Sequence, residues 1–290
     1  MTTTALNHAV SENTAFNPQP NRLKPLINNQ VCKKKVAIRA QGLNLILGGK
    51  TLLDNFDIDI HAGEVTALLG PNGAGKSSLL KVLCGEIEAT GNIEFFGQSR
   101  KQWSAKKLAK HLGVLPQHST LNFAFLAHEV VELGGLPLEL SNIQTQQITQ
   151  EKMALVDVCD LSHRLYPSLS GGEKQRVHFA RILTQLSQAG DQCVLMLDEP
   201  TSALDLAHQH RTLQVAKELA SNGAAVIIVL HDLNLAAQYA DRLVIVNHGL
   251  IQVDGTPWQA LQPNIIERVY GWPVHISPHP TGDFPVILSH

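Results

Sequence analysis

The 290-residue sequence has few cysteines, few aromatic residues and no strong excess of charge of either sign. Its four cysteines, Cys32, Cys84, Cys159 and Cys193, lie far apart and form no C-x-x-C pair. This spacing argues against a disulfide framework and a zinc site, and it predicts reduced thiols in a cytosolic chain. The formal net charge of −2 argues against broad electrostatic binding of nucleic acid or anionic lipid, so no nucleic-acid partner is expected.

Long apolar runs are also absent. The longest clean run, Ala224–Leu230 (AAVIIVL), is far shorter than the roughly 18 residues that indicate a membrane helix, and it suits a buried strand. The N-terminus has no charged start followed by an apolar stretch, so no secretory signal is expected. If the protein works at a membrane, another chain must hold it there.

Composition changes along the chain divide it into three parts. Residues 1–35 are rich in Thr, Asn, Gln and Pro without periodicity, which predicts a disordered extension. From Val36 short apolar runs alternate with amphipathic stretches, which predicts parallel strands covered by helices over 36–262. Helical patterns dominate after residue 104 and predict an inserted helical subdomain over about 104–168. Residues 263–290 predict a C-terminal tail of short helix and irregular chain.

A glycine-rich loop lies between a predicted strand at 64–69 and a predicted helix that Gly85 stops. It matches G-x-x-x-x-G-K-[ST] over Gly70, Pro71, Asn72, Gly73, Ala74, Gly75, Lys76 and Ser77, with Ser78 next. Glycines let successive backbone N–H groups turn toward the α- and β-phosphates of a nucleotide. Lys76 would reach the β- and γ-phosphates and the Ser77 hydroxyl would bind Mg²⁺. The structural alternative is a simple turn, but the flanking strand and helix favour a nucleotide site.

Polar residues follow three further predicted strands. Asp198 and Glu199 end the apolar run that starts at Cys193. Since ligands of open parallel sheets bind beyond the carboxyl ends of strands, Asp198 is expected to hold Mg²⁺ and Glu199 to polarise the attacking water. His231 could position that water, and Gln117 could ligate Mg²⁺. The alternatives are a carboxylate pair that caps a turn, a histidine that flanks a helix, and a glutamine that caps one.

The segment LSGGE, residues 169–173, raises a separate question because one phosphate cradle is already present. Ser170 and Glu173 form a capping box, which by itself would only start a helix. Gly171 and Gly172 are not needed for that box, and they remove side chains where another molecule could approach the helix N-terminus. A second ATP, held by another copy of the chain, would explain them. Two copies would then face head to tail and bury two ATP molecules.

In this order the motifs resemble those of the ATP-binding subunits of ABC transporters, over about Val36 to Gln262. The resemblance implies an α/β P-loop NTPase fold of the ABC ATPase type, with a mostly parallel core sheet, an N-terminal antiparallel β subdomain and an inserted helical subdomain. It makes Glu199 the general base, His231 the switch histidine and Gln117 the residue that couples the site to a membrane subunit. Ser202–Asp205 becomes a loop that crosses the dimer interface. The chain departs from the family pattern at Leu47, where an aromatic residue usually stacks on adenine.

Three longer stretches, residues 115–135, 199–211 and 269–287, resemble the haemin (heme) importer branch, which is close to the ferric-siderophore and vitamin B12 importers. This implies an ATP-hydrolysing homodimer with ATP and Mg²⁺, bound to two transmembrane permease subunits at the cytoplasmic face of the bacterial inner membrane. A periplasmic substrate-binding protein would be an indirect partner. A siderophore or B12 importer is the nearest alternative. Two further alternatives are a soluble ABC ATPase that acts on ribosomes or DNA and a catalytically inactive scaffold.

Overall fold

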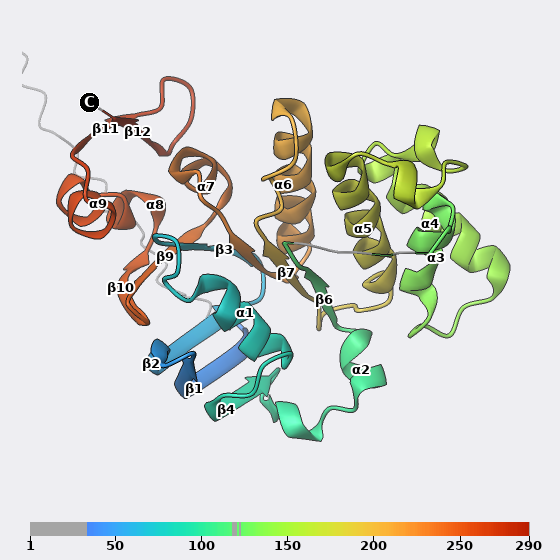
Figure 1. The fold of residues 1–290 in the computed structure, drawn as a ribbon, viewed down its shortest axis with the longest axis horizontal. Coiled ribbons are helices and arrows are strands. Elements are labelled where there is room, and N and C mark those ends of the chain that lie inside the picture. The colour runs from blue at the N-terminus through green and yellow to red at the C-terminus, as the bar shows by residue number, and fades with distance from the viewer. Residues whose placement is uncertain (1–33, 118–120, 122, 290) are drawn as a thin grey trace, which may run out of the picture. The chain divides into compact units, whose positions relative to one another are not determined.

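The computed structural model describes residues 34–117, 121 and 123–289. Figure 1 labels the main helices and strands. Residues 1–33, which include Cys32 and nearly all of the extension predicted over 1–35, lie outside the described residues, so that prediction is not tested. Of the four cysteines, Cys84, Cys159 and Cys193 are described, and all three are free thiols.

Within the described residues, six strands form the core sheet, in the order β10-β9-β3-β8-β7-β6. They are β3 (Glu64–Leu69), β6 (Leu112–Leu115), β7 (Val194–Asp198), β8 (Ala225–Val229), β9 (Arg242–Asn247) and β10 (Leu250–Gly255). All neighbours are parallel except β10, which pairs antiparallel with β9. The parallel strands therefore present their carboxyl ends at one edge of the sheet, as the sequence predicted.

Burial of both sheet faces explains why the parallel strands of the core sheet are mostly apolar, with exceptions such as Glu64 and Thr66 in β3. Successive side chains of a strand point to opposite faces. In β7, Val194 and Met196 belong to the hydrophobic cluster that includes helix α1 (Lys76–Cys84), whereas Leu195 and Leu197 belong to the cluster on the other face. A sheet covered on both faces has few strand positions that favour a polar residue.

A second sheet covers α1 on the side away from the core sheet. Its order is β2-β1-β4-β5, formed by β1 (Val36–Leu47), β2 (Lys50–His61), β4 (Thr90–Phe95) and β5 (Gln98–Ser99). All of its pairings are antiparallel. Figure 1 shows these strands beside α1, so this part of the chain is the antiparallel β subdomain that the family resemblance implied. A 3-10 turn η1 (Arg100–Gln102) and helix α2 (Ala105–Ala109) lead from it to β6.

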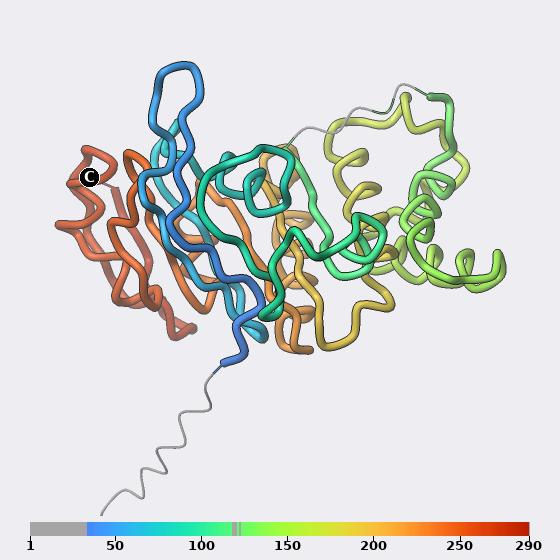
Figure 2. Tube along the Cα trace, turned by 90° about the horizontal axis from the view of Figure 1, so that it is seen from below, coloured from blue at the N-terminus to red at the C-terminus, as the bar shows by residue number. Residues whose placement is uncertain are grey.

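Helices cover the other face of the core sheet. They are α5 (Gly171–Gln185), α6 (Leu206–Ser221) and α7 (Leu233–Tyr239). Two more, α3 (Ala127–Glu132) and α4 (Asn142–Leu155), pack against α5, and 3-10 turns η2 (Leu133–Gly135), η3 (Cys159–Leu161) and η4 (Tyr166–Ser168) connect them. Figures 1 and 2 both place α3 and α4 away from the antiparallel strands, beyond the β6 edge of the core sheet. Strand β6 itself lies inside the stretch in which helical patterns dominate, and it belongs to the core sheet.

The C-terminal part is more regular than its sequence predicted. Short helices α8 (Pro257–Ala260) and α9 (Pro263–Tyr270) are followed by an antiparallel hairpin of β11 (Val274–Pro278) and β12 (Pro285–Ser289). The expectation of irregular chain was therefore wrong for these two strands. Contacts with the rest of the fold stabilise the hairpin, because Val274, Phe284 and Ile287 pack against the main hydrophobic cluster.

Candidate nucleotide site

The glycine-rich loop Gly70–Ser77 connects β3 to α1, as predicted. Gly70 and Gly75 have φ values of 143° and 103°, which side chains rarely adopt. A Cβ at Gly70 would lie 2.0 Å from the carbonyl oxygen of Val246, and one at Gly75 would lie 2.5 Å from that of Leu52. Close packing of the loop against β2 and β9 therefore requires glycine at both positions.

Lys76 lies under this loop and is almost fully buried. Its Nζ atom donates to the carbonyl oxygens of Gly70 at 2.7 Å and Pro71 at 3.1 Å. Burial lowers the pKa of Lys76, and the charges of Glu199 and Asp198 oppose that shift. The lysine is therefore held by the first residues of the loop, at the edge of the sheet where the acidic residues lie.

Ser77 and Asp198 meet at the same edge. The Ser77 hydroxyl, on the first turn of α1, donates to Asp198 Oδ1 at 2.9 Å, at the end of β7. Burial raises the pKa of Asp198, the Glu199 charge adds to the rise, and the hydrogen bond from Ser77 opposes it. A hydroxyl and a carboxylate side by side are the hard oxygen ligands that Mg²⁺ accepts, and Mg²⁺ usually keeps waters and phosphate oxygens besides.

Glu199 contacts two other predicted site residues, Gln117 and His231. One carboxylate oxygen, Oε2, accepts a hydrogen bond from Gln117 Nε2 at 2.6 Å, and Oε1 lies 2.5 Å from His231 Nε2. Gln117 follows β6, Glu199 follows β7 and His231 follows β8, so three parallel strands deliver the group. The Glu199 side chain is 13% exposed and that of His231 is 46% exposed. The Glu199 carboxylate is thus mostly buried, and the His231 side chain beside it is exposed to solvent.

The LSGGE segment starts helix α5, and its capping box is present. Ser170 Oγ accepts from the Glu173 N–H at 3.3 Å, and Glu173 Oε2 accepts from the Ser170 N–H at 2.7 Å. Hydrogen bonds from the backbone N–H and the side chain of Ser170 to the Glu173 carboxylate lower the pKa of Glu173. Within the described residues, no hydrogen bond joins 170–172 to the glycine-rich loop 70–78.

The two glycines of this segment differ in their surroundings. A Cβ at Gly172 would lie 2.7 Å from the carbonyl oxygen of Ala203, so this chain's own loop requires that glycine. A Cβ at Gly171 would meet only the Ala203 Cβ, at 3.9 Å, which is ordinary contact. Packing within this chain thus gives Gly172 a reason of its own to be glycine, whereas Gly171 leaves room, and the prediction that both glycines face an approaching molecule stays a prediction.

Leu47, where the chain departs from the family pattern, is the last residue of β1, beside the turn to β2. Leu47 pairs with Lys50 there and is 43% exposed, and the neighbouring Ile46 is 65% exposed. Lys50 in turn donates from Nζ to the carbonyl oxygen of Gly73 at 3.2 Å. This turn therefore lies beside the glycine-rich loop and presents apolar surface.

Three residues near the site were missed from the sequence. Lys50 contacts the loop at Gly73, as described above. Tyr270, at the end of α9, is partly buried beside Gly70: burial raises its pKa to about 12, and a hydrogen bond from the Gly70 backbone opposes that rise. Gln175 of α5 contacts the backbone of Glu199. A lone lysine, tyrosine or glutamine carries no sequence signal for such contacts, since each depends on how distant elements pack.

Comparison with protein families agrees with the motifs. The family model described as "ABC transporter" matches residues 53–202. "Hemin import ATP-binding protein HmuV" of Photobacterium profundum is 95% identical over 275 residues, which cover 95% of this chain and 99% of that protein. The protein of the same name from Photobacterium damsela subsp. piscicida is 65% identical over 255 residues, which cover 88% of this chain and 96% of that protein.

Solved structures show the same fold at low sequence identity. A chain from an ABC transporter described as of the metal-chelate type, in an inward-facing conformation, matches with a TM-score of 0.72 and 23% identity, over 88% of this chain and 98% of that one. The cbiO1 protein of Clostridium perfringens matches with a TM-score of 0.68 and 25% identity, over 81% and 94%. No helix among the described residues is long and apolar enough to cross a membrane.

Proposed function

The chain belongs to the ABC transporter family of ATP-binding proteins, and we propose that it is the ATP-hydrolysing subunit of a haemin importer. ATP hydrolysis follows from the family. The cargo is inferred from relatives that are 95% and 65% identical over most of their length and are named as hemin import proteins. The observation that carries the chemistry is that Gln117 and His231 both contact the Glu199 carboxylate, beside the pair formed by Ser77 and Asp198.

Each site residue has a distinct role in this proposal. The backbone N–H groups of the glycine-rich loop and Lys76 bind the phosphates of ATP. Ser77 and Asp198 would hold Mg²⁺, which supplies positive charge to the β- and γ-phosphates when it is bound. Glu199 accepts a proton from the attacking water, and His231 orients Glu199 and the γ-phosphate. A carboxylate has about four lone-pair sites, so Glu199 can accept from that water while it keeps its contacts to Gln117 and His231.

Two copies of the chain are proposed to face head to tail. Ser170–Gly172 of one copy would then contact the ATP bound by the Gly70 loop of the other, since a helix N-terminus favours phosphate. The open space at Gly171 supports this arrangement. ATP would hold the two copies together and hydrolysis would release them.

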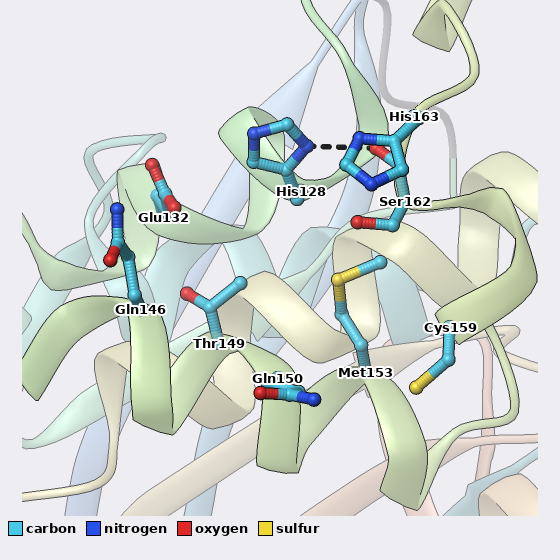
Figure 3. A pocket seen from close by; sticks show the side chains of 9 residues that line it. All are labelled: His128, Glu132, Gln146, Thr149, Gln150, Met153, Cys159, Ser162 and His163. Atoms are coloured by element: carbon cyan, nitrogen blue, oxygen red, sulfur yellow. Dashed lines mark hydrogen bonds between the residues drawn. The ribbon is translucent and has the colours of Figure 1, made fainter. Parts of the chain in front are cut away.

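The family also implies transmembrane permease subunits as partners, and a groove in the helical region suits them. A cavity of about 440 Å³ is lined by residues of α3, α4 and the turn after α4: His128, Glu132, Gln146, Thr149, Gln150, Met153, Cys159, Ser162 and His163. Figure 3 shows Thr149 and Met153 pointing from α4 toward His128 and His163. We assign this groove to a helix of the permease.

The polar groups of the groove fit a peptide partner. His128 Nδ1 donates to the carbonyl oxygen of Ser162 at 2.8 Å (Figure 3), which leaves Nε2 as an acceptor. Thr149 is 3% exposed, and its Oγ1 has no hydrogen-bond partner within the described part of the chain. Docking at this groove would place the protein at the cytoplasmic face of the inner membrane, with a periplasmic substrate-binding protein on the other side as an indirect partner.

Growth on haemin tests the cargo. A strain of the source bacterium that lacks the gene and has no second haemin importer should fail to grow with haemin as its only iron source. The wild-type gene should restore growth and the Glu199→Gln gene should not. Unimpaired growth of the deletion strain would overturn the haemin assignment and leave a siderophore or B12 importer. Rescue by Glu199→Gln would overturn the role of Glu199.

A further inference from the structure

The backbone of Glu199 adopts a conformation that is unusual for a side-chain-bearing residue. Its φ of 51° lies in the left-handed region, which costs a residue with a Cβ about 1–2 kcal/mol. Such strain persists only where the surroundings fix it, and it concentrates at functional sites. The question is therefore which groups hold Glu199 in this conformation.

Every polar group of Glu199 has a partner. Its N–H donates to the carbonyl oxygen of Val229 at 3.2 Å, and its carboxylate contacts Gln117 and His231. Its carbonyl oxygen accepts from the backbone N–H of Ser202 at 3.3 Å and from the Ser202 hydroxyl at 3.1 Å. Gln175 Nε2 donates to the same oxygen at 3.2 Å. Among these donors to the carbonyl oxygen, Gln175 comes from a distant part of the chain.

Gln175 belongs to helix α5, which begins with the LSGGE segment. Gly172, three residues earlier on that helix, packs so closely on the carbonyl oxygen of Ala203 that no side chain fits. Two contacts of one helix thus hold the loop from Glu199 to Ala203. The Gln175 Oε1 atom is buried and has no partner within the described residues, so the bond to Glu199 is the contact that fixes this side chain there.

We propose that Gln175 is a positioning residue that holds the general base Glu199 in its left-handed conformation and links it to the LSGGE segment of the same chain. This inference rests on the proposed function of Glu199 and of Ser170–Gly172. In the head-to-tail dimer, Ser170–Gly172 of one copy contacts the partner's ATP while Glu199 acts on the copy's own ATP. A displacement of α5 caused by the partner's ATP therefore moves Glu199 of the same copy, which acts on that copy's own ATP.

The test replaces Gln175 in the full chain assembled with its permease. Gln175→Met keeps the length of the side chain and removes the amide donor. The matched control is Gln214→Met, since Gln214 is exposed on α6 and has no side-chain hydrogen bond among the described residues. We expect kcat for ATP hydrolysis to fall about tenfold in Gln175→Met, with KM for ATP changed less than about twofold. We also expect dimers loaded with unhydrolysed ATP to accumulate, as retained ATP rather than ADP.

Other outcomes would overturn the inference. A wild-type kcat in Gln175→Met would remove the role of Gln175, and a parallel loss of kcat and of ATP affinity would show a merely structural role. Glu199→Gln is measured alongside: if it hydrolyses ATP at the wild-type rate, the proposed function itself fails. If Gln175→Met does not fold, Gln175→Ala removes the same amide donor with a smaller side chain. We expect it to lower kcat about tenfold with KM for ATP changed little, and a wild-type kcat would contradict the proposal.

Discussion

His231 Nε2 lies 2.5 Å from Glu199 Oε1, although the two residues are 32 positions apart in the chain. The sheet explains this contact. Asp198 pairs with Val229 across the parallel strands β7 and β8, so the residues that follow these strands emerge side by side. An acidic residue and a histidine are thereby brought into hydrogen-bond contact at the edge that also carries the glycine-rich loop.

Replacing Glu199 by glutamine should separate ATP binding from hydrolysis. The amide cannot accept a proton from water, so we expect kcat to fall by at least about a hundredfold, while ATP affinity changes little because the loop and Lys76 are intact. Hydrolysis and ATP binding by the assembled complex are the measurements. Glu267→Gln, an exposed change on α9, serves as the control and should behave as wild type. Hydrolysis at an undiminished rate would remove Glu199 from the mechanism.

Much of this site could be predicted from the sequence because each motif follows a strand. The glycine-rich loop, Asp198, Glu199 and His231 come directly after apolar runs, and parallel strands present their carboxyl ends together. The sequence did not reveal the strand order, and therefore it could not show that Glu199 touches both Gln117 and His231. That contact depends on β7 lying between β6 and β8.

Other features depend on packing between distant elements. The left-handed backbone of Glu199 and its bond to Gln175 arise where α5 meets the loop after β7, and no local pattern encodes such a meeting. The hairpin of β11 and β12 was missed because its proline- and histidine-rich sequence resembles irregular chain. Its stability comes from the rest of the fold, including a side chain of α7 that binds its backbone.

The buried histidine His178 should make stability depend on pH. Burial lowers its pKa to about 4 from an ordinary value of 6.5, and its Nε2 contacts the Tyr166 hydroxyl at 2.7 Å. Between these two values the unfolded chain binds a proton that the folded chain does not, so the free energy of unfolding falls as the pH drops. At about 1.4 kcal/mol per pH unit, the loss from this residue is about 3 kcal/mol.

Urea unfolding between about pH 4 and pH 7 measures this loss. His178→Gln can keep a hydrogen bond to Tyr166 but cannot be protonated, so its stability should fall less steeply below pH 6.5 than that of the wild type. His275→Gln, which changes an exposed histidine, should keep the wild-type slope. If the free energy of unfolding depends equally on pH in all three proteins, the pKa of His178 is not lowered by folding.

Asn234 should stabilise the C-terminal hairpin. Its side chain donates to the carbonyl oxygen of Ile287 at 3.2 Å and accepts from the Ile287 N–H at 2.8 Å, so it acts as a neighbouring strand for β12. We expect Asn234→Ala to cost about 1–2 kcal/mol and to speed amide hydrogen exchange over residues 274–289. Gln238→Ala, at an exposed position of the same helix, is the matched control. Unchanged exchange in Asn234→Ala would show that apolar packing alone holds the hairpin.

Gly171 should matter for assembly and not for folding. The space around it accepts a side chain, since a Cβ would meet only the Ala203 Cβ at 3.9 Å, and a residue other than glycine favours the helix. Gly171→Leu should therefore keep the wild-type stability within about 0.5 kcal/mol. The leucine would stand between the start of α5 and the ATP of a second copy, so ATP-dependent dimerisation in a Glu199→Gln background should weaken at least about tenfold. Analytical ultracentrifugation with and without ATP measures it, and undiminished dimerisation would show that the LSGGE segment does not face the partner's nucleotide.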